Sequence, residues 1–138
     1  MYEIEKRFTL PMGHRLSKHE GRCANWHGHN ITVLIGVESN KLNNNDMVID
    51  FSDLKKEAMK VLDEWDHCLL VNESDVILES NIDQNDFRII AFQFDPTAEK
   101  LSEVLYRTLK PRLMQTFSVD IAYVTIYENE NSKATYRE

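Results

Sequence analysis

The stretch from Cys23 to His29, CANWHGH, concentrates side chains that bind metals or move protons. It holds one of the two cysteines and two of the five histidines in this chain of 138 residues. His27 and His29 lie two positions apart, so on a strand both imidazoles would project from the same face. His14, at the end of a neighbouring predicted strand, supplies a third imidazole. Three imidazoles with an open fourth position are typical of a catalytic zinc site, and the alternative is a set of solvated loop histidines.

Cys23 has three interpretations that its spacing leaves open. As a fourth ligand it would close a structural Cys-His-His-His zinc site. Off the metal it would be a thiolate base or nucleophile, because a nearby cation lowers the pKa of a thiol from its reference value of about 8.5. The third interpretation is an inert buried thiol, which is how most intracellular cysteines behave.

Two acidic positions also carry potential chemistry. Asp66 and His67 directly follow a predicted helix, where they would form an acid/base couple in which the carboxylate fixes the imidazole tautomer. The alternative is a histidine that only interacts favourably with the helix dipole. Glu128 ends a predicted strand, and such a carboxylate is usually solvated unless a pocket lies beside it.

The elements that must position these side chains follow from the hydrophobic periodicity. Strands are predicted over residues 2–8, 31–37, 47–50, 87–94, 119–127 and 133–137. Residues 11–13 are expected to break or bend the first strand, 15–26 to form a loop and 43–46 a turn. Residues 73–86 are expected to be irregular, with one turn of helix around 76–78.

Two helices are predicted between the strands. The first has Ser52 as its N-cap and ends near Asp66. The second has Thr97 as its N-cap and stops at Pro111. Its buried stripe is predicted to be Leu101, Val104, Leu105, Thr108 and Leu109. The coarse order ββααββ predicts an α+β fold, an antiparallel sheet with two helices on one face, whose open edges favour pairing with another subunit.

The composition predicts one domain spanning residues 1–138, with 42% hydrophobic and 28% charged residues. A net charge of −7 argues against binding to nucleic acid. No apolar run approaches the ~20 residues that a membrane helix needs, and the N-terminus has no signal-like apolar region. Two cysteines do not make a disulfide framework, so we expect reduced thiols and a cytoplasmic protein without membrane partners.

Six motifs, in this order, resemble the 6-pyruvoyl-tetrahydropterin synthase and 6-carboxytetrahydropterin synthase family. They are FTLPMGHRL, CANWHGH, MVIDFSDLK, WDHCLL, DPTAEKLSEVL and VTIYEN, and the resemblance extends from Phe8 to Tyr136. It implies a T-fold (tunnelling fold) and homo-oligomers joined through their sheets, commonly dimers of trimers. It also implies active sites at subunit interfaces.

The resemblance implies a role for each candidate residue. His14, His27 and His29 match the zinc (Zn²⁺) ligands, and Cys23 matches the catalytic base, which is not a ligand. Asp66 and His67 match the acid/base couple, Glu128 the carboxylate that anchors the pterin, and Thr97 a contact to the same ring. The implied substrate is 7,8-dihydroneopterin triphosphate, whose side-chain hydroxyls zinc would acidify. Arg15, Lys18 and Arg22 are the nearby cations for its triphosphate.

The spacing Cys-x-x-x-His-Gly-His resembles the 6-carboxytetrahydropterin synthase branch of queuosine biosynthesis. This branch is a lyase that releases acetaldehyde and triphosphate. Two alternatives stay open: a 6-pyruvoyl-tetrahydropterin synthase, which eliminates triphosphate, and a non-catalytic protein with a structural Cys-His-His-His zinc site.

Overall fold

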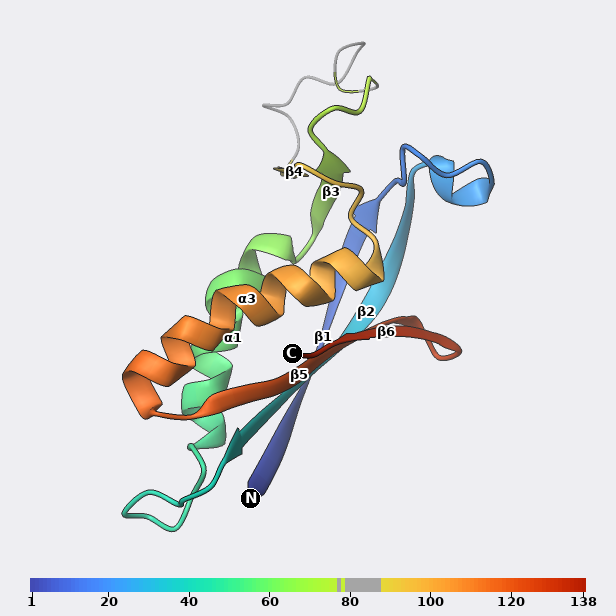
Figure 1. Cartoon of the computed structure of the whole chain (residues 1–138). Helices are drawn as coiled ribbons and strands as arrows, with labels where there is room; N and C mark the ends of the chain where they lie inside the picture. Colours follow the sequence, from blue (N-terminus) through green and yellow to red (C-terminus); the bar gives the residue numbers. More distant parts are fainter. Residues whose placement is uncertain (77, 79–87) are drawn as a thin grey trace.

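A six-stranded sheet and two long helices form the part of the chain that the computed structural model describes, residues 1–76, 78 and 88–138 (Figure 1). The elements in chain order are β1 (Tyr2–His14), a 3₁₀ turn (Arg22–Ala24), β2 (His27–Ser39), α1 (Phe51–Trp65), β3 (Cys68–Asn72), β4 (Ile89–Phe92), α3 (Ala98–Phe117), β5 (Asp120–Asn129) and β6 (Ser132–Tyr136). Among the described residues, no helix is both long and apolar enough to cross a membrane.

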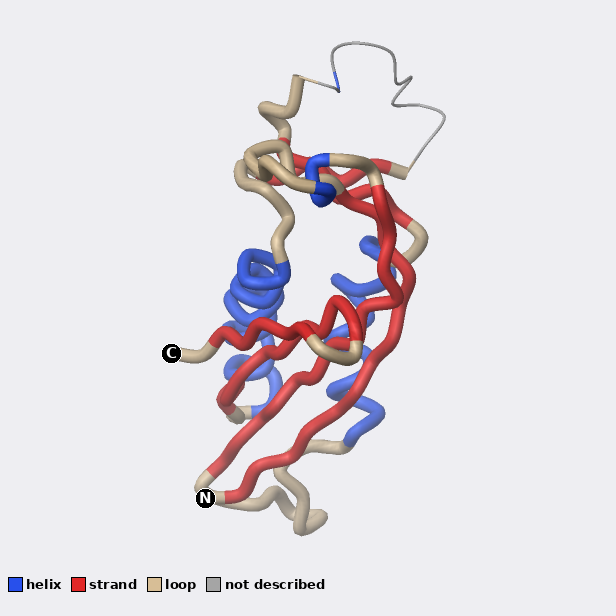
Figure 2. Tube along the Cα trace, turned by 90° about the vertical axis from the view of Figure 1, so that its right-hand side faces the viewer, coloured by secondary structure: helices blue, strands red, loops and turns tan. Residues whose placement is uncertain are grey.

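The strand order is β4-β3-β1-β2-β5-β6, and Figure 2 shows the curved course of this sheet. The pairs β1–β2, β2–β5 and β5–β6 are antiparallel, whereas β3 lies parallel to β1 and β4 parallel to β3. The predicted α+β class is therefore confirmed, with two parallel strands added to the antiparallel part. β4 corresponds to the strand predicted over residues 87–94, of which Phe87 lies outside the described residues. β3 was not predicted, because its short apolar run follows a helix directly and forms a strand only by pairing with β1.

One face of the sheet is covered by the helices. Strand alternation places Phe8, Leu10 and Met12 on this face of β1, and all three belong to one core cluster with the buried sides of α1 and α3. The buried residues of α3 include Leu101, Leu105 and Leu109, as predicted, while Val104 and Thr108 are half-buried. The helices thus bury this face of the sheet.

The first strand does not break at Pro11 and Gly13, so that prediction was wrong. The carbonyl of Pro11 accepts from the backbone N–H of His67 at 2.9 Å, so the missing N–H of this proline also faces the β3 side. β3 pairs with β1 only from Met12 onward, and an edge position tolerates proline. At Gly13 a Cβ atom would lie 2.7 Å from Leu69 Cδ2, so glycine allows β3 to approach.

Three further boundaries differ from their predictions. Residues 47–50 form no strand, and the N-cap of α1 is Asp50, whose carboxylate accepts from the backbone N–H of Ser52 at 2.7 Å. α3 continues through the exposed Pro111 and ends at Phe117, followed by the C-cap Ser118, which has φ 57°. β2 begins earlier than predicted and includes His27 and His29. The predicted irregular segment 73–86 and its helical turn lie largely outside the described residues.

Candidate active site

Three imidazoles meet where β1 ends and β2 begins. In the antiparallel register His14 lies opposite His27, and His29 lies opposite Met12. Directly opposite residues share a face, so the three rings continue the core face of the sheet beyond its last apolar side chains. Their ring centroids are 4.5, 5.1 and 5.0 Å apart, and one nitrogen from each lies within 4.8 Å of the other two.

Two backbone carbonyls set the tautomers of these rings. Nδ1 of His14 lies 2.8 Å from the carbonyl oxygen of Pro96, and Nδ1 of His27 lies 2.7 Å from that of Asn25. A carbonyl only accepts, so each neutral ring has its proton on Nδ1 and its lone pair on Nε2. Burial lowers the pKa of His14 below its ordinary value of 6.5, outweighing the hydrogen bond to Pro96, which acts in the opposite direction.

The donor set fits a zinc ion. The Nε2 atoms of His14 and His29 are buried without a hydrogen-bond partner. An unpaired buried nitrogen is costly unless a ligand occupies its lone pair. Three neutral imidazoles leave a fourth position for water or substrate, as in catalytic zinc sites. The predicted histidine cluster is therefore present, and it is able to hold a metal.

Cys23 lies in the 3₁₀ turn that precedes β2 and is an unpaired, half-buried thiol. Among the described residues, the group close enough to share one ion contains the three histidines and no sulfur. This geometry disfavours the closed Cys-His-His-His site. It leaves the thiol available for another role.

Cys23, Thr97 and Glu128 line one pocket of about 320 Å³. This volume is at the small end of ligand sites in proteins. Glu128 also joins the pocket to the imidazoles, because its Oε1 lies 3.9 Å from Nε2 of His14. The remaining lining residues are Leu16, His19, Ala98, Glu99, Ser132, Lys133 and Ala134. The structure thus gathers six of the eight predicted site residues at one end of the sheet.

Thr97 is the N-cap of α3, as predicted, and its hydroxyl oxygen accepts from the backbone N–H of Lys100 at 3.2 Å. Because that bond uses the oxygen as an acceptor, the hydroxyl proton stays available to donate. Its position at a helix start also gives the pocket wall a fixed backbone. Thr97 can therefore contribute a rigidly placed donor.

Asp66 and His67 form the predicted couple, and His67 lines a different pocket from Cys23. Nδ1 of His67 is 2.6 Å from Oδ1 of Asp66, and the His67 side chain is 75% exposed. His67 lines a pocket of about 610 Å³ together with two of the clustered imidazoles, His27 and His29, and with residues of β1 that include Pro11 and Met12. Its lining takes in residues of both faces at this end of β1 and β2, so His67 lies close to the imidazoles. Within one chain the couple does not reach the pocket of Cys23.

The backbone of His67 has φ 54°, in the left-handed region. It follows the extended C-cap residue Asp66, whereas at the end of α3 the C-cap Ser118 is itself left-handed. The N–H of His67 is bonded to Pro11, which holds the residue against β1. The position of the couple is therefore set by the end of α1.

The sequence did not identify the basic residues of the Cys23 pocket. Arg15 is engaged elsewhere, because its Nε lies 2.6 Å from the buried carboxylate of Asp75. Neither Lys18 nor Arg22 lines the pocket, whereas His19 and Lys133 do. Only the position of His19 in the cysteine loop signalled its involvement, because Lys133 is distant in sequence.

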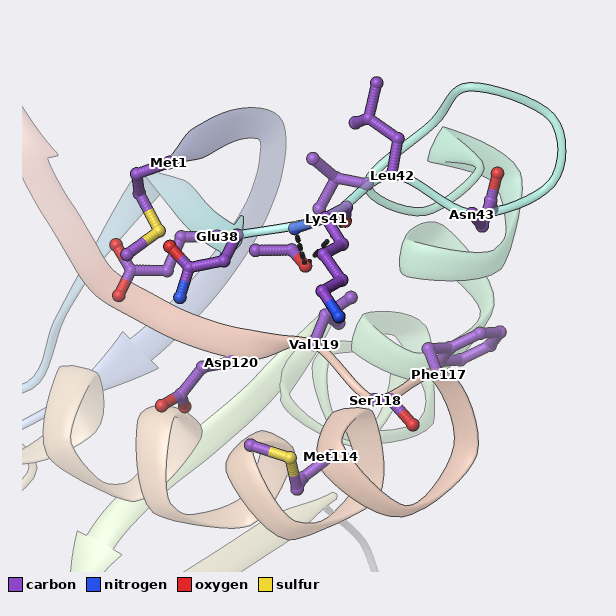
Figure 3. A pocket seen from close by; sticks show the side chains of 13 residues that line it. Met1, Glu38, Lys41, Leu42, Asn43, Met114, Phe117, Ser118, Val119 and Asp120 are labelled. Carbon is purple, nitrogen blue, oxygen red and sulfur yellow. Dashed lines mark hydrogen bonds between the residues drawn. The ribbon is translucent and has the colours of Figure 1, made fainter.

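A further pocket, of about 530 Å³, lies at the opposite end of β2 (Figure 3). Figure 3 shows Lys41, Leu42, Met114 and Phe117 around it, from the loop after β2 and the end of α3. None of its lining residues is a histidine or a cysteine. It has no part in the imidazole site.

Comparisons with known proteins agree with this arrangement. Residues 3–138 match the family model described as 6-pyruvoyl tetrahydropterin synthase. A relative from Aquifex aeolicus named 6-carboxy-5,6,7,8-tetrahydropterin synthase is 30% identical over 159 residues, covering 99% of this chain and 98% of the relative. A relative of the same name from Haemophilus influenzae is 29% identical over 145 residues, covering 100% of both chains.

Solved structures show the same fold. An uncharacterized protein from Wolinella succinogenes superposes with a TM-score of 0.83 at 22% identity, covering 99% of this chain and 98% of that one. The 6-pyruvoyl tetrahydropterin synthase of Caenorhabditis elegans has a TM-score of 0.72 at 24% identity, covering 99% and 95%. These likenesses confirm the predicted T-fold architecture.

Proposed function

Because the chain belongs to the 6-pyruvoyl tetrahydropterin synthase family, we propose that it is a zinc-dependent 6-carboxytetrahydropterin synthase. The reaction consumes 7,8-dihydroneopterin triphosphate and one water molecule, forms 6-carboxy-5,6,7,8-tetrahydropterin and releases acetaldehyde and triphosphate. The observation that carries this proposal is the convergence of Cys23, Thr97 and Glu128 on one pocket beside three imidazoles. The names of the relatives favour the carboxy product, which would serve queuosine or related deazapurine synthesis.

His14, His27 and His29 would hold the zinc ion. When bound, the ion supplies Lewis acidity that lowers the pKa of the substrate's side-chain hydroxyls. The carbonyls of Pro96 and Asn25 keep two of the rings in the tautomer that leaves Nε2 free, without any proton rearrangement on binding.

Glu128 would anchor the pterin ring. Its carboxylate accepts two hydrogen bonds from the amino and ring N–H groups, as carboxylates accept a guanidinium fork. Thr97 would add its free hydroxyl proton at the same ring. Because Glu128 is also next to His14, a ring held in this way directs its side chain toward the imidazoles.

Cys23 would act as the base that removes a proton from the substrate's side-chain carbon, and His67, oriented by Asp66, would move the hydroxyl proton. In one chain His67 and Cys23 line different pockets, so a second copy would supply the Asp66–His67 couple to the Cys23 pocket. The strand edges allow such an assembly: within the described part of the chain, β1 pairs only with β2 through residues 2–11, and β6 pairs only with β5. We therefore propose a homo-oligomer, a dimer of trimers, with active sites between subunits.

The test is the variant Cys23→Ala, assayed for zinc content and for turnover. We expect zinc to be retained and turnover to fall by roughly 10²–10⁴, the typical contribution of a positioned acid or base. Loss of zinc together with the thiol would instead support the structural Cys-His-His-His site. Assay of acetaldehyde in the wild-type reaction separates the carboxy product from the pyruvoyl alternative, which forms none.

The wider context of the proposal is a cytoplasmic enzyme that acts on a small molecule. Both cysteines are unpaired, as a reducing compartment requires. The net charge of −7 disfavours nucleic acid as a partner.

A further inference from the structure

A single carboxylate joins three segments of the chain beside the imidazole site. Oδ1 of Asp95 accepts from the hydroxyl of Ser17 at 2.5 Å and from Nδ2 of Asn72 at 3.1 Å. Its Oδ2 accepts from the backbone N–H of Lys18 at 2.9 Å. Ser17 and Lys18 belong to the loop that carries Cys23, and Asn72 ends β3. Figure 1 shows that this loop and the start of α3 lie at the same end of the sheet.

The partners of Asp95 are themselves fixed. Asn72 is 2% exposed, and its side-chain oxygen accepts from the backbone N–H of Ser74 at 3.0 Å and from the Ser74 hydroxyl at 2.8 Å. These bonds orient the amide so that its NH₂ group faces Asp95. Burial would raise the pKa of Asp95, but the hydrogen bonds from Ser17, Lys18 and Asn72 outweigh burial and hold that pKa below its ordinary value. The carboxylate is therefore ionised, and its bonds are of the stronger, charge-assisted kind.

The two residues after Asp95 contact the site directly. The carbonyl of Pro96 accepts the Nδ1 proton of His14, and Thr97 lines the Cys23 pocket. The backbone N–H of Thr97 donates to the carbonyl of Asp95 at 2.8 Å. Because the ring of Pro96 fixes its φ angle, the backbone has little conformational freedom between Asp95 and the Pro96 carbonyl that orients His14.

The loop side of the contact leads to Cys23. The backbone N–H of Leu16 donates to the carbonyl of Cys23 at 2.9 Å, which closes the loop next to Ser17. Leu16 also lines the pocket with Cys23. A displacement of Ser17 is therefore carried to the thiol through a short hydrogen-bonded path.

We propose that Asp95 is a positioning residue. It holds the Cys23 loop in a fixed position relative to the Pro96 carbonyl, which orients the metal ligand His14. The proposal rests on the proposed function, because it assigns Asp95 to the machinery of that site. It requires that one carboxylate controls two separate properties, the zinc affinity of the histidines and the accessibility of the Cys23 thiol.

The experiment compares Asp95→Ala with Asp50→Ala in the full-length protein. Asp50 is a matched control, because it is also a carboxylate before a helix that accepts a backbone N–H, and it lies at the start of α1. Zinc affinity is measured by competition with a chromogenic chelator. The rate of alkylation of Cys23 by iodoacetamide is followed by peptide mapping, which separates Cys23 from Cys68. Urea unfolding of both variants records their loss of global stability.

For Asp95→Ala we expect roughly 10-fold weaker zinc binding, as for loss of a partner that orients a ligand, and faster alkylation of Cys23. Asp50→Ala should lower stability and leave both site properties unchanged. Asp95→Asn, which keeps an acceptor oxygen, should give intermediate values. Unchanged zinc affinity and alkylation in Asp95→Ala would show that Asp95 only stabilises the fold and would overturn the proposal.

A double-mutant cycle that combines Asp95→Ala with Ser17→Ala tests whether Asp95 acts on Cys23 through Ser17. If Asp95 acts on Cys23 through Ser17, the alkylation rate of the double variant equals that of Asp95→Ala alone. Additive effects would mean independent routes and would contradict the proposal. Neither readout needs turnover, so a wild-type enzyme inactive on dihydroneopterin triphosphate would count against the proposed function and leave this result standing.

Discussion

Nε2 of His14 lies 3.9 Å from Oε1 of Glu128, which places a metal-competent nitrogen beside the carboxylate proposed to hold the substrate. The two residues come from β1 and β5, which are separated in the sheet by β2. Because the pKa of His14 is lowered, the imidazole is neutral near pH 7, so this contact is not an ion pair. Both groups are therefore free to bind their own ligands.

Substitution of Glu128 tests the anchoring role. Glu128→Ala would remove the two charge-assisted hydrogen bonds proposed to hold the pterin, and their loss should weaken binding of 7,8-dihydroneopterin by roughly 10- to 100-fold. The measurement is a fluorescence titration of the zinc-loaded protein. Zinc content should stay as in the wild type, because Glu128 does not belong to the three-histidine cluster that is proposed to bind zinc. Unchanged pterin affinity would show that the ring binds elsewhere.

Removal of one imidazole tests the metal site. His29→Ala should lose zinc at concentrations that saturate the wild type, because two imidazoles remain. In the wild type, zinc at about 100 times its Kd should add about 2.7 kcal/mol to the free energy of unfolding, and a chelator should reverse this gain. His19→Ala is the control, since this histidine lines the adjacent pocket but lies outside the cluster. Equal zinc loss in both variants would refute the assignment.

Mixing two inactive variants tests the shared active site. Cys23→Ala and His67→Ala should each lose turnover, because each lacks one proton-transfer group. If a site takes Cys23 from one subunit and His67 from another, oligomers reassembled from both variants contain some intact sites. Turnover should then reappear on mixing after reversible dissociation. No recovery, with mixed oligomers confirmed by mass spectrometry, would place both groups in one chain's site.

The carboxylate of Asp95 predicts an acid-sensitive contribution to stability. Burial raises its pKa, but the hydrogen bonds that it accepts prevail and hold the folded-state pKa below the ordinary value of 3.8. The stabilisation is therefore complete above pH 3.8 and is lost as the pH falls through the folded-state pKa. Urea unfolding of the wild type and Asp95→Asn should show a constant difference above pH 3.8 that shrinks below it. A difference that does not change with pH would exclude an ionised Asp95.

Local sequence determined the faces and several boundaries. Because side chains alternate along β1 and β2, the three imidazoles lie on the face of the sheet that forms the core. The spacing of two between His27 and His29 predicted that these two project from the same face. Thr97 capped its helix because a hydroxyl before a helical run satisfies an unpaired N–H. The rule that a proline ends a helix failed at Pro111. This residue lies on the exposed face of α3, and burial of the apolar stripe on the opposite side outweighs the cost of the proline.

Contacts between segments distant in the sequence decided the rest. β3 exists because it pairs in parallel with β1, and no local pattern encodes a parallel partner. The position of the Asp66–His67 couple depends on where α1 ends against Pro11. Hydrophobic periodicity depends only on residues that are close together in the sequence, so it does not predict contacts between distant segments. The tautomer of His14 and the role of Asp95 depend on a carbonyl and a hydroxyl brought from elsewhere, so only the tertiary structure determined them.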